Sequence, residues 1–313
     1  MVLLPANTYT LDELTEAYNQ TRTDYLIPMP MNPGRLNEYM TLYDVDLPCS
    51  RVAVAGRNII GLAMLGLRPQ QGWVTRLGVL PEGRRKGTGR ALLEALLEQA
   101  EANRAPEVWL EVIKGNEPAL NLFLQFAFQS TRELIVGRRP PRATQNTAAL
   151  LAAHKIFYLQ HEEVIDLHCS RRERMNWLNA VETMRNVRSL ASLLIDDAEP
   201  VPLHQTTHLS GILVEFRDGS QGWVSYQATT MQLKRINVTV THGAPGHVTA
   251  NLLDIMHRLH AAQDAIVENI PDDERWRGFR QAGYFEVFRR IEMVRPAETT
   301  APGGKLPNNS ERG

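Results

Sequence analysis

Three glycines and three cationic side chains fall within the seven residues 83–89, directly before a Leu-rich stretch. Glycine lets the backbone approach an anion closely, and the first N–H groups of a helix have no partner within that helix. The helix dipole and the side chains of Arg84, Arg85 and Lys86 add positive potential at the same place. The segment therefore predicts a loop that binds phosphate groups, and a diphosphate in particular.

Two common nucleotide-binding motifs do not fit this loop. A P-loop requires Lys followed by Ser or Thr after its last glycine, whereas Thr88, Gly89 and Arg90 follow Gly87 here. A dinucleotide-binding fingerprint requires a third glycine three residues after Gly89, and that position is Leu92. Two interpretations remain at this point. The loop binds another carrier of a diphosphate, or it is a glycine-rich turn with solvated arginines.

The loop resembles the acyl-CoA signature Gln/Arg-x-x-Gly-x-Gly/Ala of the GNAT superfamily of N-acyltransferases. Arg84, Gly87 and Gly89 match its positions, between "LGVLPEG" and a Leu-rich helix. A second family segment, in which a strand ends near Asn and a helix Ala-x-x-Leu-Tyr-x-x-x-Gly-Phe follows, resembles "LEVIKGNEPALNLFLQFAF". The residues that supply this match are Asn116, Ala119, Leu122, Phe123, Ala127 and Phe128. The resemblance covers residues 8–137.

The resemblance implies an acyltransferase that uses acetyl-CoA as co-substrate and no metal. The backbone around Gly78 and Val79 would pair with the pantetheine arm, and a backbone N–H there would face the thioester oxygen. The segment from Arg84 to Gly89 would hold the diphosphate. The residues expected at the acyl-CoA site are Gly78, Val79, Arg84, Arg85, Lys86, Gly87, Thr88, Gly89, Asn116 and Phe123.

Acyl transfer to an amine also requires a group that takes a proton from the ammonium. Glu111 is the candidate base, because its strand neighbours Leu110 and Val112 point to the opposite face. A solvated carboxylate on a strand is the alternative interpretation. Tyr25 and Tyr43 lie in the N-terminal region that often covers the acceptor in the family. They either line the acceptor pocket or are ordinary packing residues.

Two residues depart from the family pattern. Phe123 stands where many members have a Tyr that is thought to protonate the CoA thiolate, and Ala127 replaces the usual Gly. A CoA thiolate is a fairly good leaving group that water can protonate, so the loss of this hydroxyl slows catalysis or abolishes it. Two hypotheses follow. The protein is an N-acetyltransferase that acts on an amine of a small molecule or peptide, or it is a catalytically silent protein that senses CoA or binds a partner.

The surrounding elements predict an α+β fold of two similar halves. The first half reads as two helices, three strands, a helix, a strand, a helix and a closing strand at residues 131–137. The second half repeats the order from the three strands onward and ends with a strand at residues 285–295. We expect two GNAT-like domains, each with a mixed, mostly antiparallel central sheet flanked by helices. Their ranges are 1–140 and 141–296, and a disordered tail follows at 297–313.

The second copy has lost the features of the anion-binding loop. Its equivalent turn, "THGAPGHVTANLL", contains no Arg or Lys, and Pro245 lacks an N–H donor. Phe279 and Gly283 still match the closing family segment. We therefore expect a degenerate copy that does not bind CoA in the usual way and that shapes the acceptor site or mediates a homodimer. Before its strands, the pattern predicts an extended segment over 156–168 and one long helix over 170–194.

Composition argues against several other classes of protein. The chain has 34 Lys and Arg against 35 Asp and Glu, without the basic excess of a nucleic-acid-binding protein. Its two cysteines cannot form a disulfide framework, which indicates a reducing compartment. No apolar run reaches the roughly 18 residues of a membrane span, and the N-terminus lacks the features of a secretion signal. We therefore expect a cytoplasmic protein. The paired histidines have no clear third ligand, so no metal site is expected.

Overall fold

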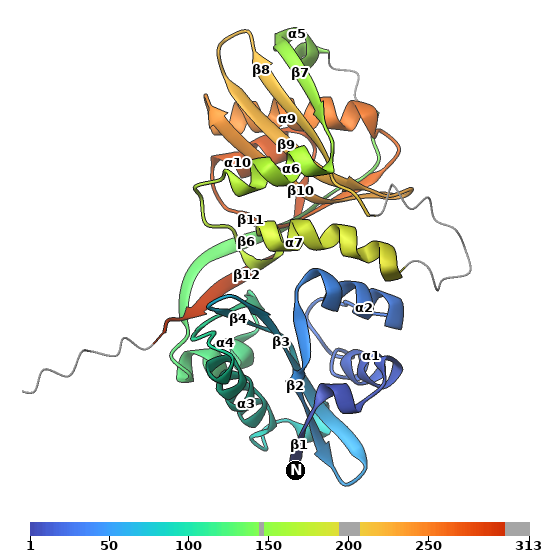
Figure 1. Ribbon diagram of the computed structural model, residues 1–313, viewed down its shortest axis with the longest axis vertical. Helices are drawn as coiled ribbons and strands as arrows, with labels where there is room; N and C mark the ends of the chain where they lie inside the picture. Colours follow the sequence, from blue (N-terminus) through green and yellow to red (C-terminus); the bar gives the residue numbers. More distant parts are fainter. Residues whose placement is uncertain (144–146, 194–206, 298–313) are drawn as a thin grey trace, which may run out of the picture.

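One continuous sheet runs through both halves of the chain (Figure 1). In this computed structural model the described residues are 1–143, 147–193 and 207–297, so the predicted tail lies outside them except for its first residue. The twelve strands follow the order β1-β2-β3-β4-β5-β12-β6-β11-β10-β9-β8-β7. Their bounds are β1 (Val2–Pro5), β2 (Val45–Ala55), β3 (Asn58–Arg68), β4 (Gln71–Val79), β5 (Glu107–Ile113), β6 (Gln129–Arg139), β7 (Ala153–Leu159), β8 (Ser210–Phe216), β9 (Gln221–Ala228), β10 (Gln232–His242), β11 (Asp264–Pro271) and β12 (Phe285–Arg295).

Helices cover both faces of the sheet in the first half. In Figure 1, α1 (Leu11–Gln20) and α2 (Pro33–Leu42) lie on one side of β2 and β3, and α3 (Thr88–Ala102) and α4 (Glu117–Gln125) lie on the other. The apolar stripe of α3 is buried against β2, β3 and β4, as its helical spacing predicts. Its buried residues include Leu92, Leu93, Leu96, Leu97 and Ala100. This arrangement confirms the α+β class.

Local capping explains where three helices of the first half begin. Thr10 Oγ1 accepts a hydrogen bond from the Glu13 N–H, and the Glu13 carboxylate accepts one from the Thr10 N–H, which is a capping box. Asn32 and Asn116 cap α2 and α4 with their side-chain oxygens. Helix α3 begins at Thr88, and its N-cap residue is Gly87, which has φ 82° and provides no side-chain cap. The start of α3 therefore differs from that of its neighbours.

The second half repeats the predicted order of elements. Strands β8, β9 and β10 form an antiparallel meander, and α9 (Pro245–Leu259), β11, α10 (Glu274–Gln281) and β12 follow. Helix α9 buries its apolar stripe against β8, β9 and β10, as α3 does against the strands of the first half. The repeat of elements supports the interpretation of two similar halves.

The closing strands of the two halves lie beside the strands of the opposite half. Strand β12 pairs antiparallel with β5, from Arg290 with Ile113 to Arg295 with Val108. Strand β6 pairs antiparallel with β11, and β6 and β12 pair with each other at the centre of the sheet. The residue pattern of a strand indicates which face is buried but not which neighbours its edges bind. As a result the two halves share one sheet, while the domain boundary at residue 140 stays a prediction.

The segment between β7 and β8 differs from two expectations. Only the start of 156–168 is a strand, because α6 (His161–Cys169) follows β7. The predicted long helix over 170–194 is also wrong, since its described part holds η3 (Trp177–Asn179), α7 (Val181–Asn186) and η4 (Val187–Leu193). Asn176 explains the break: its Oδ1 accepts from the Asn179 N–H, and its Nδ2 donates to the Asn269 carbonyl. Such side-chain bonds to the backbone compete with helix formation.

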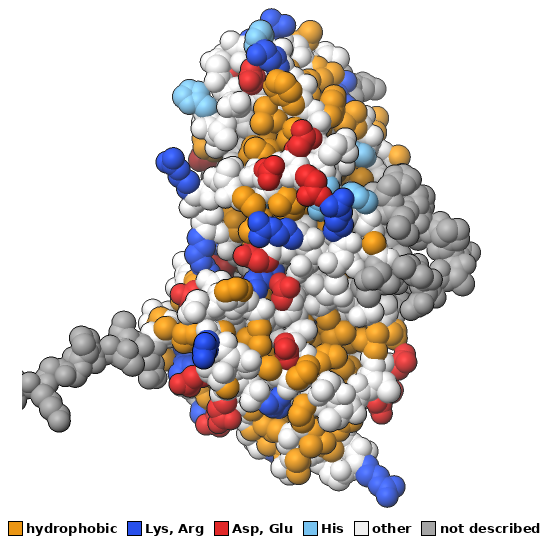
Figure 2. All heavy atoms as spheres, in the orientation of Figure 1, with side chains coloured by type: hydrophobic (Ala, Val, Ile, Leu, Met, Phe, Trp, Pro, Cys, Tyr) orange, Lys and Arg blue, Asp and Glu red, His pale blue; other side chains and the backbone are white. Residues whose placement is uncertain are grey.

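Charged side chains of both signs are interspersed over the face of the molecule shown in Figure 2. This distribution agrees with the net charge of −1. Among the described residues, no helix combines the length and hydropathy needed to cross a membrane. Cys49 is buried and Cys169 is exposed, and both thiols are free.

Candidate functional site

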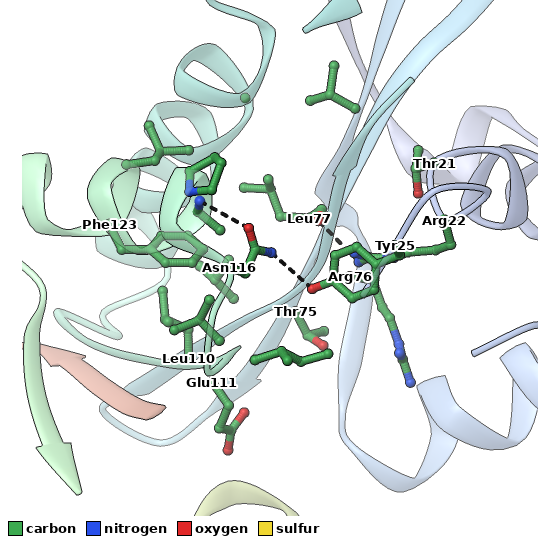
Figure 3. Close-up of a pocket in the computed structure, with 18 of the residues that line it drawn as sticks. Thr21, Arg22, Tyr25, Thr75, Arg76, Leu77, Leu110, Glu111, Asn116 and Phe123 are labelled. Atoms are coloured by element: carbon green, nitrogen blue, oxygen red, sulfur yellow. Dashed lines mark hydrogen bonds between the residues drawn. The ribbon is translucent and has the colours of Figure 1, made fainter. Parts of the chain in front are cut away.

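A fork between β4 and β5 forms the main cavity of the first half. The two strands pair in parallel only from Gln71 with Glu107 to Val74 with Leu110. Beyond that point β4 also shifts its register against β3, and Arg76 adopts a φ of 52°. The strands then diverge and leave a cavity of about 840 Å3 (Figure 3). The residues on both arms of the fork can therefore reach the same bound molecule.

The glycine-rich loop borders this cavity and has room for a diphosphate. A Cβ placed on Gly87 would meet no atom within 4 Å, and one on Gly89 would lie 3.6 Å from its nearest neighbour. Thr88 Oγ1 donates a hydrogen bond to the Gly83 carbonyl and so holds the turn before α3. The open space over Gly87 and the start of α3, which has no side-chain cap, leave this turn accessible to an anion. Arg85, also on the cavity wall, is exposed.

Arg84 is engaged by the connection between α1 and α2. Its Nε donates to the Val79 carbonyl over 3.0 Å, and its Nη2 donates to Asp24 Oδ1 over 2.7 Å. The Arg84 guanidinium lowers the pKa of the Asp24 carboxyl below its usual value, mainly through this hydrogen bonding. Both groups are exposed enough for water to screen the pair. A diphosphate that binds at the loop would therefore compete with the Asp24 carboxylate for the Arg84 guanidinium.

Nearly all of the predicted site residues surround this one cavity. Those on its wall are Val79, Arg84, Arg85, Gly87, Thr88, Gly89, Glu111, Asn116 and Phe123, together with Tyr25 and Tyr43. Gly78 and Lys86 are not on the wall: Lys86 is exposed, and Thr21 packs so closely that its Oγ1 would lie 2.4 Å from a Cβ on Gly78. The binding roles of all these residues stay predictions.

Glu111 lies at the inner end of the cavity, on the face of β5 opposite the buried side chains of Leu110 and Val112. Its Oε2 accepts a hydrogen bond from Trp73 Nε1 over 2.7 Å. Loss of contact with water raises the pKa of the Glu111 carboxyl to about 7, although the charge of Arg290 opposes this rise. A carboxyl with a pKa near neutrality can accept a proton from an amine at physiological pH.

Residues of the second half complete the inner end of the cavity. Leu178, Glu268 and Arg290 are on the cavity wall. Asn269, which is fully buried, donates from Nδ2 to Glu111 Oε1 over 3.2 Å, and its Oδ1 accepts from Arg290 Nη1 over 2.7 Å. Asn269 has a φ of 57° at a register shift in β11, which aims its side chain at the first half. The second copy therefore contributes directly to the environment of Glu111.

Phe123 packs where the family pattern has a tyrosine. It is 6% exposed, and its ring lies edge-on to that of Phe128. A phenolic hydroxyl on the cavity wall comes instead from Tyr25, which accepts a hydrogen bond from Asn116 Nδ2 over 3.3 Å (Figure 3). The cavity wall thus has a phenolic hydroxyl although Phe123 does not provide one.

The two helices of the second half that correspond to α3 and α4 pack tightly against each other. A Cβ on Gly278 of α10 would lie 2.4 Å from the carbonyl oxygen of Gly246 in the first turn of α9. In the first half α3 and α4 both border the cavity, and a Cβ on Gly89 would be in ordinary contact with Leu122, at 3.6 Å. The tight contact between α9 and α10 agrees with the expectation that the second copy is degenerate.

The histidine pairs show no metal-binding arrangement within the described residues. No group of three or more His, Cys, Asp or Glu side chains there is placed to hold a metal ion. His257 Nε2 hydrogen-bonds to the Tyr284 hydroxyl, and His260 Nδ1 to Gln263 Oε1. His204, of the other pair, lies outside the described residues.

Several residues of the site were not identified from the sequence. Those on the cavity wall are Arg22, Asp24, Arg76, Leu178, Glu268 and Arg290, and Asn269 contacts Glu111 from behind the wall. No sequence signal exists for Arg76, because its orientation depends on the register shift of β4 against β3. None exists for the residues of the second half either, because strand exchange brings them to the site.

Comparison with known proteins identifies the first half by sequence. Residues 11–128 match the model of the acetyltransferase (GNAT) family. The chain is similar to an N-alpha-acetyltransferase of Sulfurisphaera tokodaii, with 39% identity over 66 residues. This match covers 21% of the chain and spans only 40% of the relative's length.

Solved structures show the same fold along the whole chain. A GCN5-related N-acetyltransferase from Sphaerobacter thermophilus has a TM-score of 0.64 and 15% identity, over 94% of this chain and 95% of that one. A tandem GNAT protein from the clavulanic acid biosynthesis pathway has a TM-score of 0.60 and 13% identity, over 96% and 99% of the two chains. At this level of identity the likeness concerns the fold alone.

Proposed function

We propose that this chain, whose residues 11–128 match the acetyltransferase (GNAT) family, is an N-acyltransferase of the GNAT superfamily that transfers an acetyl group from acetyl-CoA to an amine of a small molecule or peptide. The observation that carries this proposal is the fork between β4 and β5. The glycine-rich start of α3 forms one part of the cavity wall. The Glu111 carboxyl, which can accept a proton, lies at the inner end of the same cavity. These are the two parts that acyl transfer to an amine requires.

The loop and the diverging strand hold the donor in this proposal. The N–H groups at the start of α3, with Arg84 and Arg85, bind the diphosphate. The backbone of β4 near Val79 pairs with the pantetheine arm, where it has left β5. Acetyl-CoA supplies the activated acyl group as a thioester, and no metal is required.

Glu111 accepts the proton during the transfer. The amine nitrogen bonds to the acyl carbon, the C–S bond to coenzyme A breaks, and the proton that the amine loses goes to Glu111. Trp73 and Asn269 hold the two oxygens of the Glu111 carboxylate and so orient it. Water protonates the departing thiolate, since Phe123 has no proton to give.

A catalytically silent protein that senses CoA or binds a partner is the second candidate. The side chain of Phe123, buried against Phe128 without a hydroxyl, favours it. A Phe123→Tyr variant separates the two candidates when CoA release is measured. An enzyme keeps or increases its amine-dependent rate, whereas a silent protein releases no CoA with either residue.

The proposal is tested by CoA release from acetyl-CoA with a panel of amines, together with acetyl-CoA affinity by calorimetry. An Arg84→Ala/Gly87→Ala variant should lose amine-dependent release and bind acetyl-CoA more weakly by about 10- to 100-fold. The matched control is Gly56→Ala/Arg57→Ala, in an exposed turn where Gly56 also has a positive φ and open space around it. Equal acetyl-CoA binding by both variants and the wild type would place the donor elsewhere.

The same proposal covers partners and location. The acceptor is a soluble amine, and the reaction takes place in the cytoplasm, where Cys49 and Cys169 stay reduced. The second half binds no CoA and serves the acceptor end of the cavity. A homodimer is compatible with this arrangement and is tested by light scattering.

A further inference from the structure

Arg76 brings a guanidinium to the acceptor end of the cavity. It sits at the register shift of β4 with a φ of 52°, which turns its side chain out of the regular strand pattern. Its Cζ lies 4.0 Å from the centroid of the Tyr39 ring, and Tyr39 stacks on Trp73, the residue that donates to Glu111. In Figure 3 Arg76 and Glu111 come from the two arms of the fork, and both are on the cavity wall. In the proposed function Arg76 is therefore on the wall that surrounds the acceptor.

Among the described residues, Arg76 forms no ion pair. Its Nη1 donates to the Tyr18 hydroxyl over 3.0 Å, and its buried Nε has no hydrogen-bond partner. Two other arginines on the cavity wall are paired with a carboxylate: Arg84 with Asp24, and Arg290 with Glu268. Arg76 differs from these two because part of its guanidinium has no hydrogen-bond acceptor.

A second guanidinium without an ion pair in the described chain lies close by. The Cζ atoms of Arg22 and Arg76 are 5.3 and 5.2 Å from the centroid of the Tyr18 ring. The buried Nε of Arg22 has no partner either, while its Nη2 donates to the Leu77 carbonyl. The faces of the tyrosine rings compensate for part of the cost of removing these charges from water. An anion would recover more, because a charged partner is the usual compensation for a buried cation.

We propose that Arg76 binds an anionic group of the acceptor, a carboxylate or a phosphate, while the amine of the same molecule lies at Glu111. The acceptor is then an amino-acid-like amine, not a polyamine, because a second ammonium group would face Arg76. Arg22 adds positive potential at the same end. This inference rests on the proposed function and names its substrate class.

The test compares amines that differ only in the group at the far end. In the carboxylate arm, γ-aminobutyrate is compared with butylamine and putrescine, which have the same number of carbon atoms. In the phosphate arm, phosphoethanolamine is compared with ethanolamine. For the wild type, kcat/KM should be at least about tenfold higher with the carboxylate or the phosphate than with the matched neutral amine or diamine. The arm with the larger ratio identifies the anion.

Arg76→Gln should remove this preference. We expect KM for the anionic amine to rise about 10- to 100-fold, with little change for the neutral amine and no change in acetyl-CoA affinity. Arg76→Lys should restore part of the preference, because it keeps the charge but loses the planar fork of donors. Arg57→Gln, an exposed arginine in the turn between β2 and β3, is the matched control and should leave the preference intact.

If Arg76→Gln fails to fold, the ratios of kcat/KM between anionic and neutral amines for the wild type still test the inference. Equal or higher rates with putrescine or butylamine would overturn the inference, and so would the absence of turnover with any anionic amine. An enzyme that acetylates neutral amines or polyamines would still be an acetyltransferase. Failure to bind acetyl-CoA at all would instead contradict the proposed function.

Discussion

Asn269 of the second half donates a hydrogen bond from Nδ2 to Oε1 of Glu111 in the first half, over 3.2 Å. Asn269 is fully buried, and its own Oδ1 accepts from Arg290. The contact links two strands, β5 and β11, that β12 and β6 separate in the sheet. The second half of the chain thus holds the proposed catalytic carboxyl of the first half.

Removal of the Asn269 side chain should change the pH dependence of the reaction. Asn269→Gly is the suitable variant, because glycine tolerates the φ of 57° at this position. The amide donates to the charged form of Glu111, so its loss should raise the pKa of that carboxyl further and move the rising limb of kcat/KM to higher pH. The measurement is the pH profile of wild type and variant. If kcat/KM falls at every pH while the midpoint of its rising limb stays the same, Asn269 affects only the structure of the site and not the pKa of Glu111.

Glu111→Gln should lower kcat/KM by about 100- to 10,000-fold, because the amine then has no positioned proton acceptor. In the wild type the base must be deprotonated, so activity should rise with pH through about 7, the pKa of Glu111. The variant should lose this limb while it binds acetyl-CoA normally. Glu98→Gln, on the exposed side of α3, is the control. A Glu111→Gln enzyme with wild-type activity and profile would show that another group is the base.

The same carboxyl should make folding stability depend on pH. Folding raises the pKa of Glu111 from about 4.5 to about 7, mainly through loss of water, so the folded state binds more protons between these values. The stabilising contribution is therefore present below about pH 4.5 and is lost as the pH rises through about 7. The difference in free energy of unfolding between Glu111→Gln and wild type should shift in favour of the variant by at most about 3 kcal/mol from pH 4.5 to pH 8. Urea unfolding across this range measures it, and a constant difference would contradict the raised pKa.

The contact between α9 and α10 should not tolerate a side chain. Gly278→Ala would place a Cβ 2.4 Å from the backbone oxygen of Gly246, so one helix must move. The free energy of unfolding should fall by about 1–3 kcal/mol. Gly34→Ala in α2 is the matched control, because its Cβ would lie 3.6 Å from the nearest atom, and alanine favours a helix. Equal effects of the two substitutions in thermal or urea unfolding would contradict the tight packing.

Local sequence patterns were sufficient to locate the loop of the predicted donor site. The glycines and arginines of residues 83–89 follow one another directly before α3, and the loop borders the cavity. Its binding of an anion stays a prediction. Neighbouring residues of a strand point to opposite faces of the sheet. The apolar residues on either side of Glu111 therefore predicted that its carboxyl lies on the other face of β5. Leu110 and Val112 are indeed buried on the face opposite Glu111.

The acceptor side depends on contacts that no local pattern encodes. Asn269 and Arg290 reach the site because β12 lies beside β5 and β11 bends at a register shift. Arg76 points into the fork because β4 leaves β5 after Val74 and changes its own register. The pairing of strand edges and the positions of β-bulges depend on tertiary packing, so they cannot be predicted from the local sequence.

The sequence by itself determined the α+β class, the repeat of two similar halves, the glycine-rich turn before a helix and the face of Glu111, because each follows from the spacing of neighbouring residues. Only the tertiary structure decided which half supplies each wall of the cavity, how Glu111 is held, and how closely α9 and α10 pack. Those outcomes depend on residues distant in the chain that meet in space, such as Glu111 and Asn269, whose side chains lie at hydrogen-bond distance.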